Sequence, residues 1–243
     1  MPLREEHEKI GNWLFRWRSY LPLLMLGIAL TGMRDFTYPA GSHKWDEIWE
    51  ALCLVVSFTG LGIRALVIGY VPEGTSGRNT RSQKAFLLNV TGLYSIVRHP
   101  LYLGNLFIWL GISLYVRQWM LGFVFVLVFW LYYERIIFAE EEFLRRQFGE
   151  SYESWASVTP CFFPRFSQWV SPDRPFSWKK VLKDEYSGFF AIVAIFTVLE
   201  VISDWIVEGT LKLDIEWGIF FLAGLTIYSI LLTMKKKRML EPD

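Results

Sequence analysis

The stretch "GLYSIVRHPLYLGNL" covers residues 92–106 and sets Arg98, His99 and Pro100 directly before an apolar run. Proline is tolerated in the first turn of a helix, because the N–H that it lacks would have no partner there. A charged side chain at a membrane boundary usually has a function or a nearby aqueous partner. We therefore expect a helix to start near Pro100 at the edge of a membrane, with polar groups gathered at its start.

The composition indicates an integral membrane protein. Hydrophobic residues make up 53% and aromatic residues 18% of the 243-residue chain, whereas an average soluble domain is about 45–50% apolar. The formal net charge is only +1, so no strong overall field indicates a nucleic acid partner. Cys53 and Cys161 are too few and too isolated for a disulfide framework or a zinc site, and we expect no metal.

Apolar segments along the chain predict an all-α, polytopic membrane protein with about six transmembrane helices, since a helix needs roughly 20 residues to cross the hydrocarbon layer. The first is the weakest, because two arginines and Pro22 interrupt its start, and its helix can begin as late as Tyr20. A short turn, "YVRQW", joins the third and fourth as a helical hairpin. The six segments lie near residues 14–33, 48–70, 101–116, 119–138, 187–207 and 216–234.

The distribution of Lys and Arg predicts the orientation. With six spans, one side of the membrane holds both termini and the polar segments around 71–98 and 135–186. That side carries 20 of these cations and the opposite loops carry 4. Because cytoplasmic loops are enriched in Lys and Arg, we expect the active site to face the cytoplasm, in a pocket formed by the two polar segments.

Three glutamates, Glu140, Glu141 and Glu142, follow the fourth apolar segment, where they lie next to the bilayer. Carboxylates without partners are unfavourable there. A cationic ligand or the arginines of the first polar segment would satisfy them. A solvated helix face, with Arg145 and Arg146 as partners, is the alternative for this run of glutamates, and for Glu142 above all.

Three motifs resemble the membrane-embedded isoprenylcysteine carboxyl methyltransferases and their bacterial relatives. They are "RHPLYLG" at 98–104, "EEEFLRRQFGESYESW" at 140–155 and "VTPCFFP" at 158–164. The resemblance spans roughly residues 70 to 166 and keeps the hairpin between the first two motifs. It implies N-terminal transmembrane helices in 1–70, a methyltransferase core in 71–166, and a C-terminal helix pair in 167–243.

The resemblance also implies S-adenosylmethionine as the methyl donor. A histidine and backbone groups freed by a proline can bind its polar end, and a glutamate can accept from its amino or hydroxyl groups. Gly104 would let the cofactor or a neighbouring helix approach closely. Carried over by position, the cofactor-binding residues are Asn79, Phe86, Leu87, Leu88, Asn89, Tyr94, His99, Pro100, Leu101, Tyr102, Gly104, Glu140 and Glu141.

Methyl transfer to an ionised carboxylate or phosphate oxygen needs no general base, so positioning and charge placement suffice. Arg98, Arg78 and Arg81 are therefore the candidates for holding the anionic acceptor, which an arginine can do with two hydrogen bonds. The family's substrate arginine falls at the spacing of Ile136 here, with Arg135 one place earlier.

Several alternatives stay open. The lead-in "GTSGRNTRSQKAFLLN" at 74–89 is similar to the bacterial lipid A phosphate methyltransferase branch and favours a lipid phosphate over prenylcysteine. A sterol-type membrane reductase that uses NADPH shares an Arg-His-Pro-like turn, but "FGESY" after the glutamates argues against it. A non-catalytic membrane protein on the same scaffold is the third class.

Several of these residues could also have a purely structural role. Arg98 and His99 could be interfacial residues, and Arg78 and Arg81 could only enforce the topology. Two acidic residues of the fifth segment could face an internal polar cavity, pair with a cation inside the bundle, or mark the outer interface. These two are Glu200 and Asp204, and the cation is Arg64.

Overall fold

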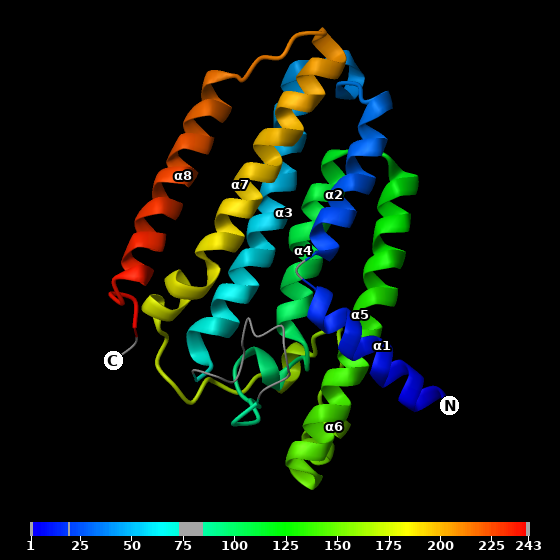
Figure 1. The fold of residues 1–243 in the computed structure, drawn as a ribbon, viewed down its shortest axis with the longest axis vertical. Helices are drawn as coiled ribbons and strands as arrows, with labels where there is room; N and C mark the ends of the chain where they lie inside the picture. The colour runs from blue at the N-terminus through cyan, green and yellow to red at the C-terminus, as the bar shows by residue number, and fades with distance from the viewer. Residues whose placement is uncertain (1, 19, 73–84, 242–243) are drawn as a thin grey trace.

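The computed structural model describes residues 2–18, 20–72 and 85–241. Helices dominate these residues, which confirms the all-α class, and they include no strand longer than an isolated antiparallel bridge between Gly92 and Val170. The helices run side by side along one axis as a bundle (Figure 1).

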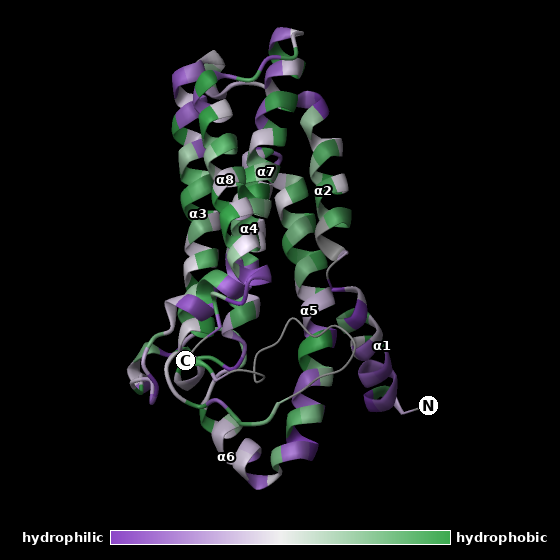
Figure 2. Cartoon of the chain, turned by 60° about the vertical axis from the view of Figure 1, so that its left-hand side comes forward, coloured by the Kyte–Doolittle hydropathy of each residue, from purple (hydrophilic) through white to green (hydrophobic). Residues whose placement is uncertain are grey.

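Four helices of the described residues are long and apolar enough to cross a membrane. They are α3 (His43–Tyr70), α5 (Trp119–Phe148), α7 (Trp178–Glu208) and α8 (Ile215–Lys236). Figure 2 shows apolar residues along their length. Two shorter helices, α2 (Leu21–Gly32) and α4 (Pro100–Tyr115), lie within the same bundle. By length, therefore, the structure supports four spans, and the predicted number of about six is not confirmed.

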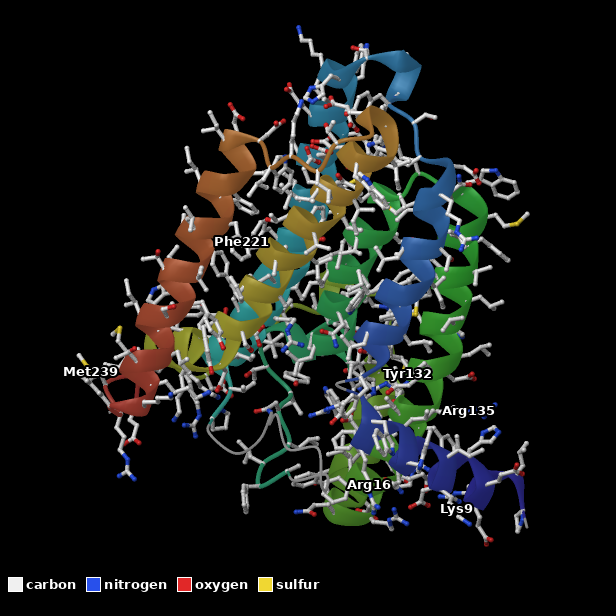
Figure 3. The ribbon with its side chains drawn as sticks, turned by 45° about the horizontal axis from the view of Figure 1, so that its top comes forward. Lys9, Arg16, Tyr132, Arg135, Phe221 and Met239 are labelled. Atoms are coloured by element: carbon white, nitrogen blue, oxygen red, sulfur yellow. The ribbon has the colours of Figure 1, made fainter. Side chains whose placement is uncertain are left out.

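The first predicted segment, 14–33, is not one helix, but the later start at Tyr20 that the sequence also allowed is confirmed. The chain forms α1 (Leu3–Trp17) and then α2, with Tyr20 as the cap before α2. Pro22 lies in the first turn of α2, where a proline is tolerated but could not have continued α1. The polar α1 packs against α5, because Gly11 admits the carbonyl of Arg135 and the Tyr132 hydroxyl donates 2.9 Å to the carbonyl of Leu14. Figure 3 shows Tyr132 and Arg135 beside α1.

The predicted hairpin of α4 and α5 is confirmed, with the turn between Tyr115 and Trp119. Helix α5 is longer than the predicted 119–138, because the glutamates and arginines that follow are good helix formers. Gly149, in the left-handed region with φ 53°, separates α5 from α6 (Glu150–Val158).

Helices α3 and α4 cross closely through glycines. A Cβ on Gly60 would lie 2.4 Å from the carbonyl oxygen of Gly104, and a Cβ on Gly111 would lie 2.2 Å from the Ser57 hydroxyl. The Ser57 hydroxyl also donates 2.8 Å to the carbonyl of Ile108. Gly104 therefore serves the approach of a neighbouring helix, one of the two roles predicted for it.

Both chain ends and α6 lie at one end of the bundle (Figure 1). The irregular segments 85–99 and 159–177, with the short helices η3 (Leu93–Ser95) and η4 (Phe166–Gln168), lie at this end as well. The opposite end holds the η1 (Met33–Asp35) and η2 (Pro39–Gly41) segment and the turns after α4 and α7. The described parts of the two predicted polar segments thus share one end of the bundle.

Candidate functional site

The Arg-His-Pro motif lies where an irregular segment turns into α4. His99 is the cap residue and Pro100 is the first residue of the helix, as the sequence predicted. Two backbone bonds hold the motif segment against 160–165: Arg98 N donates 2.9 Å to the carbonyl of Pro160, and Arg165 N donates 2.9 Å to the carbonyl of Ile96. The third motif of the sequence therefore supports the first.

Glu141 joins the two motifs. Its Oε1 lies 2.9 Å from Nη1 of Arg98 and 3.1 Å from Nε2 of His99. Because an ionised carboxylate only accepts, His99 carries its hydrogen on Nε2 in this contact. The Cys161 thiol lies 3.8 Å from the same oxygen. One carboxylate of α5 therefore fixes the start of α4 and the segment after α6.

Glu140 and a row of aromatic rings flank the hub, by which we mean Glu141 with its contacts Arg98, His99 and Cys161. The Glu140 carboxylate lies 3.7 Å from Nδ1 of His99, beyond hydrogen-bonding distance. The His99 ring stacks on Tyr102 with centroids 5.7 Å apart, and Tyr102 contacts Tyr133 at 4.7 Å. Burial, with a smaller contribution from Glu140, raises the pKa of Tyr94, so this hydroxyl stays neutral.

Two further polar groups face Glu141. Burial and the Glu141 charge raise the pKa of the Cys161 thiol to about 11. The same two causes, burial first, raise the pKa of Tyr152. Its hydroxyl is buried and, among the described residues, has no hydrogen-bond partner; the same holds for Nε of Arg98. The site thus retains donors that a bound group could use.

The structure brings together a central part of the predicted site, namely Tyr94, Arg98, His99, Tyr102, Glu140 and Glu141. Leu101 lies half-buried beside them on α4. Phe86 and Leu87 are exposed, at 76% and 50%, and Leu88 and Asn89 are half-buried. Arg78, Asn79 and Arg81 lie outside the described residues.

The other face of α5 packs against α1. Glu142 is buried and accepts from Nη2 of Arg4 at 2.5 Å and from Nη1 of Arg145 at 2.5 Å. The alternative therefore named its partner Arg145 correctly, but its expectation of a solvated face is wrong for this residue. Arg135 contacts the ring of His7. Neither side chain joins the cluster around Glu141.

Sequence reasoning missed three site residues. Cys161 was set aside as isolated, although it lies inside the third motif. Tyr152 stands in "FGESY" and Tyr133 lies two turns before Glu140, but nothing in the sequence shows which face of a helix meets the site. Only the packing of α5 on α4 identifies Tyr133.

Glu200 and Asp204 lie at the opposite end of the bundle. The Tyr115 hydroxyl contacts Glu50 at 2.9 Å and Glu200 at 2.7 Å, and Tyr38 donates 3.0 Å to Asp204. Both acids are buried, so they face an internal polar cluster. Arg64 is elsewhere and pairs with Glu185 at 2.6 Å.

The cluster around Glu141 can hold a polar ligand with both charges. Arg98 offers donors to an anionic group, and Glu140 and the aromatic rings suit a cationic one. Ligand atoms of His99, Glu141 and Cys161 also lie within 4.8 Å of one another, as a metal site requires. The Arg98 guanidinium, 2.9 Å from the same Glu141 oxygen, opposes a metal cation there.

Comparisons with known proteins agree with the motifs. Residues 72–151 match the family described as phospholipid methyltransferase. The nickel-cobalt-cadmium resistance protein NccN of Alcaligenes xylosoxydans xylosoxydans is 34% identical over 152 residues, 62% of this chain and 64% of that protein. The cobalt-zinc-cadmium resistance protein CzcN of Cupriavidus metallidurans is 33% identical over 128 residues, 52% of this chain and 56% of that protein.

A protein-S-isoprenylcysteine O-methyltransferase of Schizosaccharomyces pombe is 36% identical over 86 residues, which are 35% of this chain and 36% of that protein. In each case the chain spans less than two thirds of the length of the relative. No solved structure matches. Together with the four long apolar helices, these relatives identify an integral membrane protein.

Proposed function

Because the comparisons confirm the predicted resemblance to isoprenylcysteine methyltransferase-like membrane enzymes, we propose that this protein transfers a methyl group from S-adenosylmethionine to an anionic group of a membrane lipid or lipidated substrate. The observation that carries the proposal is the hub at Glu141. It joins the Arg-His-Pro motif, the glutamate motif and Cys161 at the edge of the apolar bundle.

The residues around the hub fit the cofactor chemically. Its sulfonium and amino groups are cationic, and the half-exposed carboxylate of Glu140 and the rings of Tyr94 and Tyr102 favour cations. Its carboxylate and hydroxyls need donors, which backbone N–H groups at the start of α4 can supply. When bound, the cofactor supplies an electrophilic methyl group with a neutral leaving group. The chain's residues orient it and exclude water.

Arg98 is the acceptor-binding candidate inside the described residues. Its Nη1 holds Glu141, but its buried Nε remains without a protein partner there. An ionised phosphate or carboxylate oxygen accepts such an N–H and needs no base to become a nucleophile. We assign Arg78 and Arg81 to the same task. Asn79 and residues 86–89 remain proposed cofactor contacts, as do Pro100, Leu101 and Gly104.

We favour a lipid phosphate as the acceptor. Methylation of a phosphate monoester removes one ionisable oxygen, and with it one unit of charge that a divalent cation could bind. Such a loss of metal-binding charge at a membrane would be consistent with relatives whose names state resistance to nickel, cobalt, zinc and cadmium.

The proposed topology has six crossings, with α2 and α4 added to the four long helices. Both termini, residues 71–99 and residues 149–177 then face the cytoplasm, in agreement with the excess of Lys and Arg there. The core that we assign to 71–166 would lie between an N-terminal unit, 1–70, and a C-terminal helix pair, 167–243.

Calorimetric titration of the purified protein in detergent tests the cofactor, and lipid mass spectrometry of cells with and without the protein tests the acceptor. We expect binding of S-adenosylmethionine, no thermal protection by NADPH, and lipids that differ by one methyl mass. Protection by NADPH alone would favour the sterol-type reductase. If cells without the protein lose both the methylated lipid and their tolerance of divalent metals, the result would support the phosphate acceptor.

Arg78→Ala and Arg81→Ala separate substrate binding from topology. Each should spare cofactor binding and lower turnover roughly tenfold to a hundredfold, as the loss of a charge-assisted hydrogen bond does. Lys at either position should rescue only part of the rate if the contact is bidentate. Full activity in both Ala variants would mean that these residues only set the topology.

A further inference from the structure

A buried ion pair toward the site end of α3 and α7 connects these two helices to the site. Arg64 of α3 donates from Nε to Glu185 of α7 at 2.9 Å and from Nη2 at 2.6 Å, a bidentate contact. The side chains are 19% and 5% exposed. Both residues lie outside the segment 72–151 that matches the phospholipid methyltransferase family.

The pair continues into the matched segment through hydrogen bonds. Nη1 of Arg64 donates 2.8 Å to the Asn105 side-chain oxygen, and the Asn105 amide donates 3.0 Å to the Tyr133 hydroxyl. These bonds fix the orientation of the Asn105 amide. From Tyr133 the contacts pass through Tyr102 to His99. A chain of contacts thus runs from α7 to the Arg-His-Pro motif.

Stability alone does not explain the pair. Replacing a buried ion pair by apolar residues is often neutral or stabilising, because two charges must be removed from water. A charged pair inside a membrane bundle therefore suggests a task. The same part of α7 also holds the end of α3, since Lys180 donates to the carbonyls of Val71 and Pro72.

We propose that Arg64 is a positioning residue for the cofactor site. Held by Glu185, it orients Asn105 and thereby fixes the rings of Tyr133, Tyr102 and His99 in one arrangement. Helix α7, which lies outside the matched family segment, is then a working part of the site. The inference rests on the proposed function for its cofactor readout, but the arrangement of the rings can be tested without any cofactor.

The test compares two apolar replacements of buried ion pairs. Arg64→Met with Glu185→Leu removes the positioning pair. Arg117→Met with Asp46→Leu is the matched control, because Arg117 and Asp46 form a comparable pair at the opposite end. Both double variants should keep the melting temperature within a few degrees of the parent. A third variant, Asn105→Leu, breaks the chain of contacts without touching either charge.

Two readouts separate positioning from simple stability. One is affinity for S-adenosylmethionine, and the other is the alkylation rate of Cys161, which lies in the site and needs no cofactor. We expect the Arg64 double variant and Asn105→Leu to lose cofactor affinity roughly tenfold and to alkylate Cys161 faster. The Arg117 double variant should match the parent in both. Arg64→Lys should restore only part of the affinity, because it lacks the planar fork.

Parent-like Cys161 alkylation in a folded Arg64 double variant would overturn the inference, as would the same changes in the Arg117 control. Failure of the parent itself to bind S-adenosylmethionine would instead refute the proposed function. In that case the alkylation rates would still decide whether Arg64 orders the site.

Discussion

The two ends of the bundle bury their glutamates in different ways. At the site end, Glu141 is 19% exposed in its side chain and meets two basic groups, Arg98 and His99. At the far end, Glu50 and Glu200 are each 4% exposed and share one tyrosine hydroxyl. The first arrangement pairs opposite charges beside irregular segments, and the second groups acids within regular helices.

At the far end, few hydroxyl hydrogens are available for the two buried glutamates. The Tyr115 oxygen lies within hydrogen-bonding distance of Glu50, Glu200 and Ser203, but it has one hydrogen to give. Ser203 already donates to the carbonyl of Glu200. The two buried carboxylates therefore share a single hydroxyl donor. The oxygens of this cluster are satisfied by its own groups. Among the described residues, buried donors without a hydrogen-bond partner occur at both ends, at Nε of Arg98 and the Tyr152 hydroxyl and at Nε of Arg117.

The largest effect that we predict is at the site end. Glu141→Ala should destabilise the fold by about 3 kcal/mol, because it leaves the mostly buried Arg98 guanidinium without its carboxylate. Cofactor binding should be lost as well. Thermal unfolding and calorimetric titration in detergent measure the two effects. Glu153→Ala is the control, since this exposed glutamate lies 3.3 Å from Arg145 and should matter by less than about 0.5 kcal/mol. Equal losses in the two variants would contradict the hub.

The crossing of α3 and α4 joins the two ends, and Gly60→Ala should disturb it. The new Cβ would lie 2.4 Å from the carbonyl oxygen of Gly104 and 2.6 Å from the amide of Ile108, which are backbone atoms. We expect a loss of about 2 kcal/mol from overpacking, with reduced cofactor affinity because Gly104 lies in the motif. On the same helix, Gly62 has open space within 4 Å of its Cβ position.

Gly62→Ala should therefore stabilise α3 by about 0.5–1 kcal/mol through helix propensity. Unfolding temperatures of the two alanine variants decide the matter. A Gly60→Ala protein as stable as the Gly62→Ala protein would show that the helices separate easily, and that the ends of the bundle are not rigidly joined.

At the far end, Tyr115→Phe should affect stability without affecting the site. The variant removes the hydroxyl shared by Glu50 and Glu200, and we expect a loss of about 1–2 kcal/mol for the unsatisfied buried groups. Affinity for S-adenosylmethionine should stay at the parent value. The same unfolding and titration measurements apply. If affinity fell together with stability, the far-end cluster would also affect the site, and the proposed difference between the two ends would be wrong.

The sequence predicted the site end better than the far end for a physical reason. Arg98, His99 and Glu141 lie in motifs whose spacing places a helix start and a helix end side by side. Glu50 and Glu200 lie in different apolar helices, 150 positions apart in the numbering. Only the rotation of each helix about its axis brings them together at Tyr115, and hydropathy does not encode that rotation clearly.

The ends of helices could likewise be predicted only where a local residue pattern marks them. The start of α4 was predictable because Pro100 fixes it, and the hairpin turn because polar residues interrupt two apolar runs. The polar α1 was missed because the apolar stretch 14–33 conceals a break before Leu21. The pairing of Arg64 with Glu185 rather than with Glu200 was also beyond the sequence, since it depends on which level of α7 lies against α3.

The smallest effect concerns Cys161, which should react slowly at neutral pH. Burial and the Glu141 charge raise the pKa of its thiol to about 11, well above the usual value of about 8.5. The thiolate is the reactive form, so alkylation should accelerate about tenfold per pH unit from neutral pH and level off only near pH 11. Because the native state retains this proton to higher pH than the unfolded chain, the group's contribution to stability is present below the ordinary thiol pKa and is lost as the pH rises toward 11.

Alkylation followed by mass spectrometry measures the rate, with Cys161→Ser as the control for labelling at the fully buried Cys53. Glu141→Gln should lower the pH at which the rate levels off, because it removes the neighbouring negative charge. An unchanged profile in that variant would mean that burial alone protects the thiol, and that Glu141 is not the centre of charge at this end of the bundle.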